Sequence, residues 1–271
     1  MNFKKSGIFS WKSELEERLS EDFEPRNQVL AVWGSPGCGK TMTAVKLAKH
    51  LAGKKKNVVL LLCDMTAPML PCICPPGELE SEHSLGSVLA AARVSESLVK
   101  HNLITHKRYD CLTFLGMLRG ENEYTYPPYT ASQASELIQC LRNIAPYIII
   151  DCGSYIANDI LSAVALMESD AVLRLVNCDL KSVSYLASQL PLLRDNQWDA
   201  DKQYKVACNV KANEASDHVE QVLGNVTFKL PNSLELASQS LAGNLLADLS
   251  LRDSKGFRKE MEAISREVFG C

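Results

Sequence analysis

A short segment beginning at residue 34 carries glycines, a lysine and a threonine at the spacing of a phosphate-binding loop. It reads Gly34-Ser35-Pro36-Gly37-Cys38-Gly39-Lys40-Thr41, which matches the pattern G-x-x-x-x-G-K-[ST]. Glycines let successive backbone N–H groups turn towards one anion, and the N-terminus of a following helix favours negative charge. An apolar run precedes the segment and a helical pattern follows it. The segment therefore predicts a site for the phosphates of a nucleotide.

The residue types within this loop indicate which atoms would contact the nucleotide. The Lys40 ammonium reaches the β- and γ-phosphates in such loops, and the Thr41 hydroxyl is a hard oxygen ligand for Mg²⁺. The backbone N–H of Met42 is a further donor. We therefore expect nucleotide contacts from Gly34, Ser35, Pro36, Gly37, Cys38, Gly39, Lys40, Thr41 and Met42.

A second candidate for this chemistry is an aspartate that follows a wholly apolar run. Asp151 closes the sequence Tyr147-Ile148-Ile149-Ile150-Asp151. A phosphate-binding loop needs a carboxylate on a neighbouring strand to hold the magnesium ion. We predict that Asp151 is this carboxylate and, with Thr41, a magnesium ligand, and that Gly153 can donate its N–H to a γ-phosphate. A plain turn at the end of the strand is the alternative.

Asp64 ends another apolar strand pattern, Asn57–Cys63, in the same manner. The end of a second strand would place it at the carboxyl edge of a parallel sheet, beside the phosphates. There it could orient the attacking water or contact magnesium. An aspartate that only stabilises its own turn is the alternative, and both interpretations stay open at this point.

Strand and helix patterns alternate along the chain, which is typical of a parallel sheet covered by helices on both faces. Several strand patterns are almost continuously apolar, as strands buried on both faces should be. We predict an α/β fold with a doubly wound, mostly parallel sheet in three layers. The expected strands are Gln28–Trp33, Asn57–Cys63, Tyr109–Leu115, Pro146–Asp151, Ala171–Asn177, Gln203–Cys208 and Asn225–Leu230.

The helical patterns lie between and after these strands, and no linker divides them. We therefore predict a single domain over residues 28–271 and an N-terminal extension over residues 1–27 with a short helix at Trp11–Asp22. The other expected helices are Lys40–Ala52, Leu85–Val94, Ala131–Arg142, Asn158–Glu168, Lys181–Leu193, Ala215–Leu223, Ser233–Ala242 and Ser254–Val268.

Composition narrows the functional classes. Of the 271 residues, 46% are hydrophobic and 23% charged, which excludes a disordered or fibrous chain. The net charge of -3 gives no support for nucleic-acid binding. The chain has no apolar stretch of transmembrane length and its first residues lack the apolar core of a signal peptide, so we expect a cytoplasmic protein with its ten cysteines reduced.

The order of these motifs resembles the MinD/ParA group of P-loop ATPases, and within it the CpaE/TadZ branch of pilus-assembly localisation proteins. The resemblance runs from about Gln28 to Leu249 and implies a site for Mg-ATP. It implies that Lys40, Asp64 and Asp151 act in hydrolysis. It also implies that Asn209 recognises adenine and that Pro231 lies near the base. No guanine-reading N/T-K-x-D motif occurs, which favours ATP over GTP.

The loop departs from this family's pattern at three positions. Ser35 stands where the family carries a second lysine that reaches across a dimer, Pro36 replaces a glycine, and Met42 replaces a threonine. A missing cation near the γ-phosphate lowers the rate of phosphoryl transfer. We therefore predict slow hydrolysis and keep an ATP-dependent homodimer as a hypothesis.

The resemblance implies a switch that positions or regulates a cellular assembly, with pilus or secretion machinery as the leading partner. One alternative is a nucleotide-binding scaffold with little or no turnover, and another is a ParA-like DNA segregation ATPase, which the net charge disfavours. A bacterial tyrosine kinase would need tyrosines near its C-terminus, whereas the last one here is Tyr204. A metallocluster carrier would need a bridging cysteine, for which Cys152 is the only candidate.

Two further patterns could indicate either packing within the domain or contact with a membrane or partner. Phe257, Met261, Ile264 and Val268 recur at helical spacing beside basic residues. Acidic residues dilute the basic face, so a helix packed on the domain is favoured over peripheral membrane contact. The tyrosines at 124, 126 and 129, beside two prolines, are interpreted as part of an ordered loop rather than a partner surface.

Overall fold

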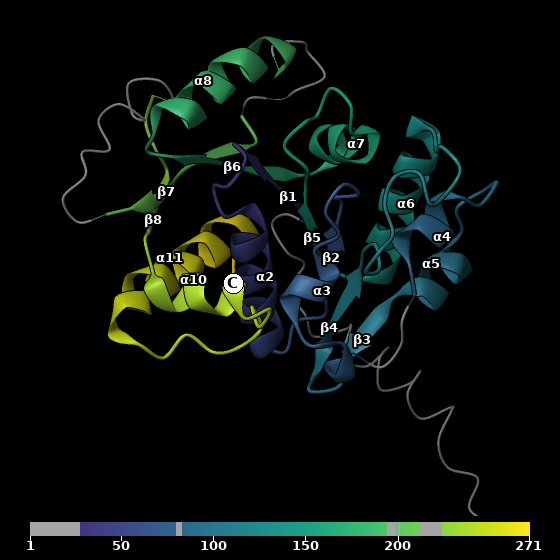
Figure 1. Ribbon diagram of the computed structural model, residues 1–271, viewed down its shortest axis with the longest axis horizontal. Helices are drawn as coiled ribbons and strands as arrows, with labels where there is room; N and C mark the ends of the chain where they lie inside the picture. The colour runs from purple at the N-terminus through teal and green to yellow at the C-terminus, as the bar shows by residue number, and fades with distance from the viewer. Residues whose placement is uncertain (1–27, 80–82, 194–198, 200, 212–223) are drawn as a thin grey trace, which may run out of the picture.

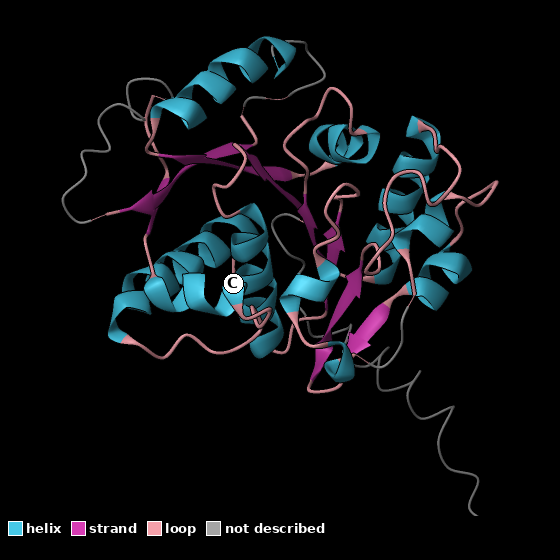
Figure 2. Cartoon of the chain, in the orientation of Figure 1, coloured by secondary structure: helices cyan, strands magenta, loops and turns pink. Residues whose placement is uncertain are grey.

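A twisted, mostly parallel sheet forms the centre of the structure (Figures 1 and 2). The computed structural model describes residues 28–79, 83–193, 199, 201–211 and 224–271. In these residues eight strands follow the order β3-β4-β2-β5-β1-β6-β7-β8, and only the β3–β4 pair is antiparallel. The strands are β1 (Val29–Gly34), β2 (Val58–Leu62), β3 (Ile104–His106), β4 (Tyr109–Leu115), β5 (Tyr147–Asp151), β6 (Ala171–Asn177), β7 (Gln203–Val210) and β8 (Phe228–Pro231).

Helices cover both faces of the sheet, so the predicted three-layer α/β fold is confirmed. One face packs against α2 (Lys40–Gly53), α3 (Leu70–Ile73), α10 (Leu234–Leu241) and α11 (Lys255–Ile264). The other face packs against α4 (Leu85–Leu89), α5 (Glu96–Asn102), α6 (Ala131–Ile144), α7 (Ile160–Glu168) and α8 (Leu180–Gln189).

Strand β5 shows why a central strand of this sheet has a continuously apolar sequence. Tyr147 and Ile149 face one core, whereas Ile148 and Ile150 face the other. Side chains alternate between the faces of a sheet, so both faces of a central strand must be apolar when helices cover both. All five residues of β5 are buried, including Asp151 at its end.

The strand order brings the predicted site residues to one edge of the sheet. Strand β1 lies between β5 and β6, and β5 in turn pairs with β2. In register, Asp151 lies beside Val32 of β1 on one side and beside Leu62 of β2 on the other. The loop after β1, Asp151 and Asp64 therefore lie at the carboxyl ends of neighbouring parallel strands.

The sequence missed short elements and misjudged several boundaries. The expected helix Leu85–Val94 ends at Leu89, and a second helix, α5, begins after Ser95, whose side chain accepts a hydrogen bond from the Leu98 N–H. The three-residue strand β3 and the one-turn helix α3 were not predicted, because neither is long enough to display a period. The expected helices at residues 11–22 and 215–223 lie outside the described residues.

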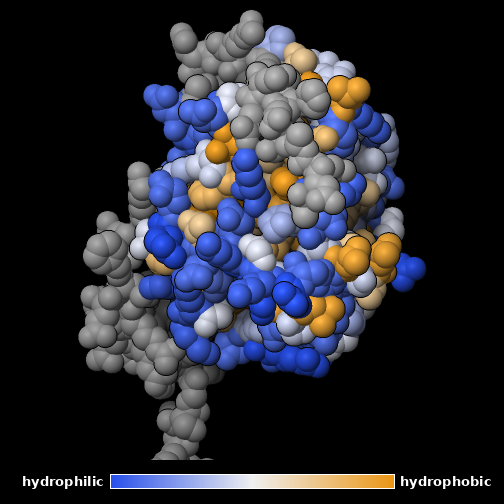
Figure 3. Space-filling model, turned by 90° about the vertical axis from the view of Figure 1, so that its left-hand side faces the viewer, coloured by the Kyte–Doolittle hydropathy of each residue, from blue (hydrophilic) through white to orange (hydrophobic). Residues whose placement is uncertain are grey.

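The C-terminal segment packs on the domain, as its pattern predicted. Phe257, Met261 and Ile264 of α11 are buried, and Val268 is buried in the turn of π-helix Ser265–Phe269 that follows. On the side of the molecule that includes β8, α10 and α11, the coloured residues are mostly hydrophilic, with apolar residues in separate small patches (Figure 3). Among the described helices, none combines the length and apolar character that a membrane crossing requires.

Candidate nucleotide-binding site

The predicted phosphate loop joins β1 to α2, and its backbone geometry requires glycine at three positions. A Cβ on Gly34 would lie 1.9 Å from the Leu175 carbonyl oxygen of β6, so only glycine fits this crossing. Gly37 and Gly39 adopt positive φ angles of 73° and 88°, which glycine tolerates without strain. Gly39 precedes the first residue of α2 and offers no side-chain cap. The first N–H groups of this helix therefore lack a side-chain acceptor at its N-cap, as an anion site requires.

The Lys40 side chain contacts both the phosphate loop and the segment after β5. Its Nζ donates to Ser154 Oγ at 2.6 Å and lies 3.5 Å from the Ser35 carbonyl oxygen. Ser154 Oγ in turn donates to the Gly34 carbonyl oxygen at 3.0 Å. The sequence did not single out Ser154, because a serine three residues after a strand-end aspartate carries no specific signal.

Thr41 and Asp151 are brought together as the magnesium prediction requires. Thr41 Oγ1 donates to Asp151 Oδ2 at 2.5 Å, whereas the buried Asp151 Oδ1 has no hydrogen-bond partner among the described residues. Burial raises the pKa of Asp151 to about 7, although the Thr41 hydrogen bond and the Lys40 charge act in the opposite direction. A buried carboxylate oxygen without a donor is costly, and a hard cation would satisfy it. The hydroxyl and carboxylate therefore fit Mg²⁺.

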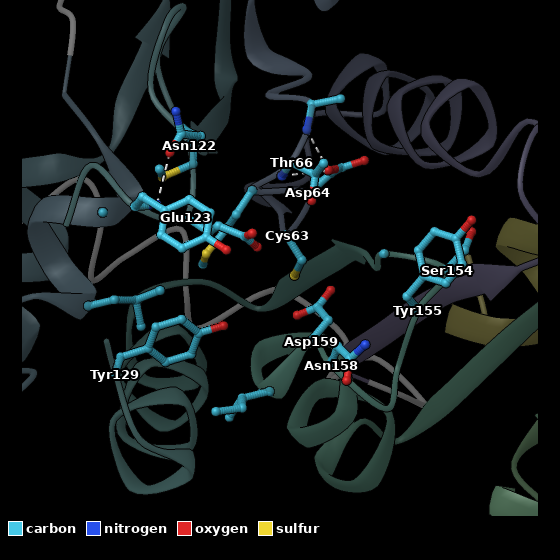
Figure 4. Close-up of a pocket in the computed structure, with 18 of the residues that line it drawn as sticks. Cys63, Asp64, Thr66, Asn122, Glu123, Tyr129, Ser154, Tyr155, Asn158 and Asp159 are labelled. Atoms are coloured by element: carbon cyan, nitrogen blue, oxygen red, sulfur yellow. Dashed lines mark hydrogen bonds between the residues drawn. The ribbon is translucent and has the colours of Figure 1, made fainter. Parts of the chain in front are cut away.

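Asp64 lies on the same cavity as Lys40 but also stabilises its own turn. Its Oδ1 accepts hydrogen bonds from the backbone N–H groups of Thr66 at 3.0 Å and Ala67 at 2.8 Å (Figure 4). The two interpretations offered by the sequence are thus compatible, since one oxygen holds the turn while the residue faces the site. The predicted donor Gly153 instead gives its N–H to Ser162 Oγ at 2.8 Å, at the start of α7.

A cavity of about 910 Å³ opens beside the phosphate loop (Figure 4). Its walls come from the loop, from the turn after β2, from the segment after β5 and from the tyrosine- and proline-rich loop before α6. The tyrosines that were interpreted as part of an ordered loop line it. Tyr126 donates to Glu121 at 2.6 Å, and the Tyr129 hydroxyl accepts from the Leu161 N–H at 3.1 Å, whereas Tyr124 is 87% exposed. This loop is ordered by its own bonds and also forms a wall of the cavity.

A smaller cavity of about 50 Å³ lies on the other side of the loop, between the ends of β7 and β8 and the start of α10. Asn209 and Pro231, the two residues that the resemblance assigned to the base, line it together with Met42. Asn209 has a φ of 53° and its Nδ2 donates to Asn177 Oδ1 at 2.6 Å. Asn177, at the end of β6, also donates to the Gly37 carbonyl oxygen at 3.3 Å and was not predicted.

Ser35 occupies the loop position where the resembling family carries a second lysine. It is fully buried, and its Oγ donates to Ser182 Oγ of α8 at 3.0 Å. Its N–H donates to the Leu175 carbonyl oxygen. The side chain at this position is therefore directed into the packing between the loop and α8.

The comparisons with known proteins identify the fold. No family model and no curated protein matches the chain. Among solved structures, a ParA family ATPase from Chlorobium tepidum aligns with a TM-score of 0.70 at 16% identity, over 86% of this chain and 96% of that one. The septum site-determining protein MinD from Pyrococcus horikoshii, complexed with Mg-ADP, aligns with a TM-score of 0.68 at 13% identity, over 89% and 96%.

A third structure, an ATP complex of a variant of McdA from Cyanothece, aligns with a TM-score of 0.63 at 18% identity, over 88% of this chain and 95% of that one. Each alignment spans nearly the whole of the solved chain, and the order of strands and helices is that of a P-loop domain. At these identities the likeness establishes architecture alone. The chain therefore has the P-loop fold of the ParA and MinD ATPases.

Proposed function

We propose that the chain binds Mg-ATP and hydrolyses it slowly, as a switch that positions or regulates a cellular assembly. The observation that carries the proposal is the buried Asp151 carboxylate, which shares one oxygen with Thr41 and leaves the other without a partner among the described residues. A nucleotide with its magnesium ion would satisfy this oxygen and the N-terminus of α2 together.

Each residue has a distinct task in this proposal. Lys40 would exchange Ser154 for the β- and γ-phosphates, and the loop amides would bind the remaining phosphate oxygens. Mg²⁺, held by Thr41 and Asp151, would neutralise the charge that develops on the phosphates. Asp64 would orient the attacking water with its second oxygen, while its first oxygen keeps the turn in place.

The adenine base would lie at the mouth of the smaller cavity, beside Asn209 and Pro231. The Asn209 amide, oriented by Asn177, would read the edge of the base. This arrangement supports ATP as the nucleotide, since none of the described residues there belongs to a guanine-reading motif. The solved neighbours bound to Mg-ADP and ATP agree with this choice of ligand.

One observation favours a second candidate, a nucleotide-binding scaffold with little or no turnover. Because Ser35 is buried against Ser182, no second cation extends from this position towards a γ-phosphate. An added cation is worth orders of magnitude in the rate of phosphoryl transfer. The two candidates share the binding site and differ only in the rate of phosphate release.

Steady-state release of phosphate from Mg-ATP separates these candidates. We expect slow turnover in the wild type that disappears in Lys40→Ala, which serves as the control for contaminating ATPases. ATP binding without release would favour the scaffold. If the wild type binds no ATP in an equilibrium titration with Mg²⁺ present, both candidates are wrong.

The assembly that the switch acts on is proposed from the motif resemblance alone. We infer a cytoplasmic protein whose partner is pilus or secretion machinery and whose ATP-bound form can dimerise. Affinity purification of the tagged wild type and of Lys40→Ala from the native cell tests this. Pilus or secretion components should co-purify only with the wild type, and sedimentation with and without ATP should report the dimer.

A further inference from the structure

Three side chains connect the phosphate loop to helix α8 through a continuous set of hydrogen bonds. The Lys40 ammonium donates to the Ser154 hydroxyl at 2.6 Å. That hydroxyl donates to the Gly34 carbonyl oxygen at 3.0 Å, and the Ser154 carbonyl oxygen accepts a hydrogen bond from the Tyr185 hydroxyl of α8. Ser154 is only 9% exposed and belongs to the segment that follows β5 (Figure 4).

Helix α8 packs on β6 and makes two side-chain hydrogen bonds to other segments. Ser182 and Leu186 are its buried residues, and Ser182 bonds to Ser35 of the phosphate loop. Tyr185 lies beside Trp33 of β1, with ring centroids 6.0 Å apart. The opposite side of α8 is exposed, and Leu180 at its start is 81% exposed. The hydrogen bonds of Ser182 and Tyr185 therefore both lead to the nucleotide site.

A bound triphosphate would compete directly for the first link of this chain. The ammonium of a phosphate-loop lysine is attracted by the negative charge of the phosphate oxygens, which a neutral hydroxyl lacks, so Lys40 should leave Ser154 for the phosphates. When Lys40 turns to the phosphates, Ser154 loses a donor at its hydroxyl. Ser154 is then held by its own hydroxyl, which donates to the Gly34 carbonyl oxygen, and by Tyr185, which donates to the Ser154 carbonyl oxygen.

We propose that Ser154 and Tyr185 are positioning residues that transmit the phosphate-bound state of Lys40 to α8. The inference rests on the proposed function, because it needs a nucleotide that engages Lys40. Tyr185 does not touch the nucleotide site itself and acts only through the Ser154 main chain. The exposed side of α8 then changes its position or order with the nucleotide state.

The fluorescence of Trp33 gives a direct readout, because this ring lies beside Tyr185. The chain has three tryptophans, and Trp33 is the one among the described residues. In a Trp11→Phe and Trp198→Phe background, a non-hydrolysable ATP analogue with Mg²⁺ should change the Trp33 emission. Hydrogen exchange of the α8 amides, measured in the same two states, provides a second readout.

Tyr185→Phe removes only the hydroxyl that holds Ser154. We expect this variant to bind the analogue within about twofold of the background protein and to lose the nucleotide-induced change in α8 exchange by about fivefold or more. Ser154→Ala should lose the same change, because the hydrogen bond from Lys40 to the Ser154 hydroxyl, which the nucleotide would break, is then absent. Tyr109→Phe is the matched control, since the Tyr109 hydroxyl also donates to a main-chain carbonyl, that of Leu246 at 3.3 Å.

The outcomes separate this inference from the proposed function. A Tyr185→Phe protein with an undiminished response would overturn the inference, and so would an equal loss in Tyr109→Phe. If the background protein binds the analogue without any change in Trp33 emission or α8 exchange, the inference is wrong and the proposed function stands. If it binds no analogue, both are wrong.

Discussion

At the scale of single residues, the sequence predicted which side chains lie near one another better than it predicted their hydrogen bonds. Thr41 and Asp151 meet as expected, and the charge of Lys40 acts on Asp151, because the loop motif and a carboxylate after a buried strand are local signals. Ser154, Ser182 and Asn177 were missed, since each gains its role from a strand or helix distant in sequence. A single serine or asparagine gives no local sign of such a partner.

Asp151→Asn separates the effect of the buried carboxylate on magnesium binding from its effect on the stability of the fold. We expect binding of Mg-ATP to weaken by roughly tenfold to a hundredfold, because the amide is a poor magnesium ligand. The thermal midpoint without ligand should stay equal or rise, because an unpartnered buried oxygen loses its charge. Calorimetric titration and thermal denaturation measure both effects. Asp110→Asn, an exposed aspartate on β4, is the control.

Ser35→Lys restores the lysine that the family pattern carries. Because Ser35 is fully buried against Ser182, we expect the ammonium to destabilise the fold by roughly 2 kcal/mol or more and not to accelerate phosphate release. Urea unfolding and the phosphate-release assay measure these effects. Ser184→Lys, on the exposed side of α8, controls for the added charge. Faster release from an equally stable Ser35→Lys protein would contradict the expected packing of this position.

At the scale of elements, the ion pair between Arg142 and Asp170 connects β1, α6 and β6. Asp170, which precedes β6, accepts hydrogen bonds from the N–H groups of Gln28 at 2.9 Å and Val29 at 2.8 Å. Arg142 of α6 donates to both Asp170 oxygens, at 2.7 Å and 3.0 Å. The start of β1, the end of α6 and the start of β6 are thus fixed by one carboxylate.

Asp170→Asn tests this connection through its pH dependence. Partial burial alone would raise the pKa of Asp170, but the hydrogen bonds from Arg142 and Val29 outweigh it and hold the pKa below its usual value. A lowered folded-state pKa stabilises the fold above the unfolded value near pH 4, and this stabilisation is lost as the pH falls through the folded pKa. We expect the variant to lose roughly 1–2 kcal/mol at pH 7.

The difference between the wild type and Asp170→Asn in urea unfolding should shrink as the pH falls below about 4. Asp110→Asn, at an exposed position on β4, is the control substitution. A constant gap between pH 7 and pH 3 would mean that packing, rather than the charge of Asp170, supplies the stability.

The elements that the sequence predicted are those whose apolar residues recur at a clear strand or helix spacing. Strand β5 and helix α6 are long enough for alternation or helical spacing to be read, and α6 adds a capping box from Thr130 and Gln133. The end of α4 was misplaced because Ala90 to Val94 continue an apolar pattern while the chain turns towards Ser95. Tertiary contacts decide such boundaries, and local propensity does not reveal them.

At the scale of the whole molecule, α11 links the last strand to the phosphate-loop side of the sheet. It packs against β8 and α2, and Phe257 is 3% exposed. We propose that residues 28–271 form one cooperative unit, as the absence of a linker in the sequence predicted. The doubly wound order was predictable from alternation, whereas the antiparallel edge strand β3 depends on a pairing that three residues cannot display.

Phe257→Ala should therefore destabilise the entire domain by about 3 kcal/mol. Trp33 fluorescence and far-ultraviolet circular dichroism should report one coincident urea transition, shifted equally. Lys259→Ala, on the same helix, should leave the midpoint almost unchanged. Two separate transitions would mean that the C-terminal region unfolds independently of the sheet.

The two cavities beside the phosphate loop differ greatly in size, and this difference has a consequence for chemical labelling. The cavity on the Lys40 and Asp64 side measures about 910 Å³, whereas the one beside Asn209 and Pro231 measures about 50 Å³. An ATP derivative with a bulky photoreactive group on its terminal phosphate would have room for that group. In the proposed binding mode, the same group on the base would lie beside the smaller cavity, where there is less room, so probes for capturing neighbours of this protein are best built from the phosphate end.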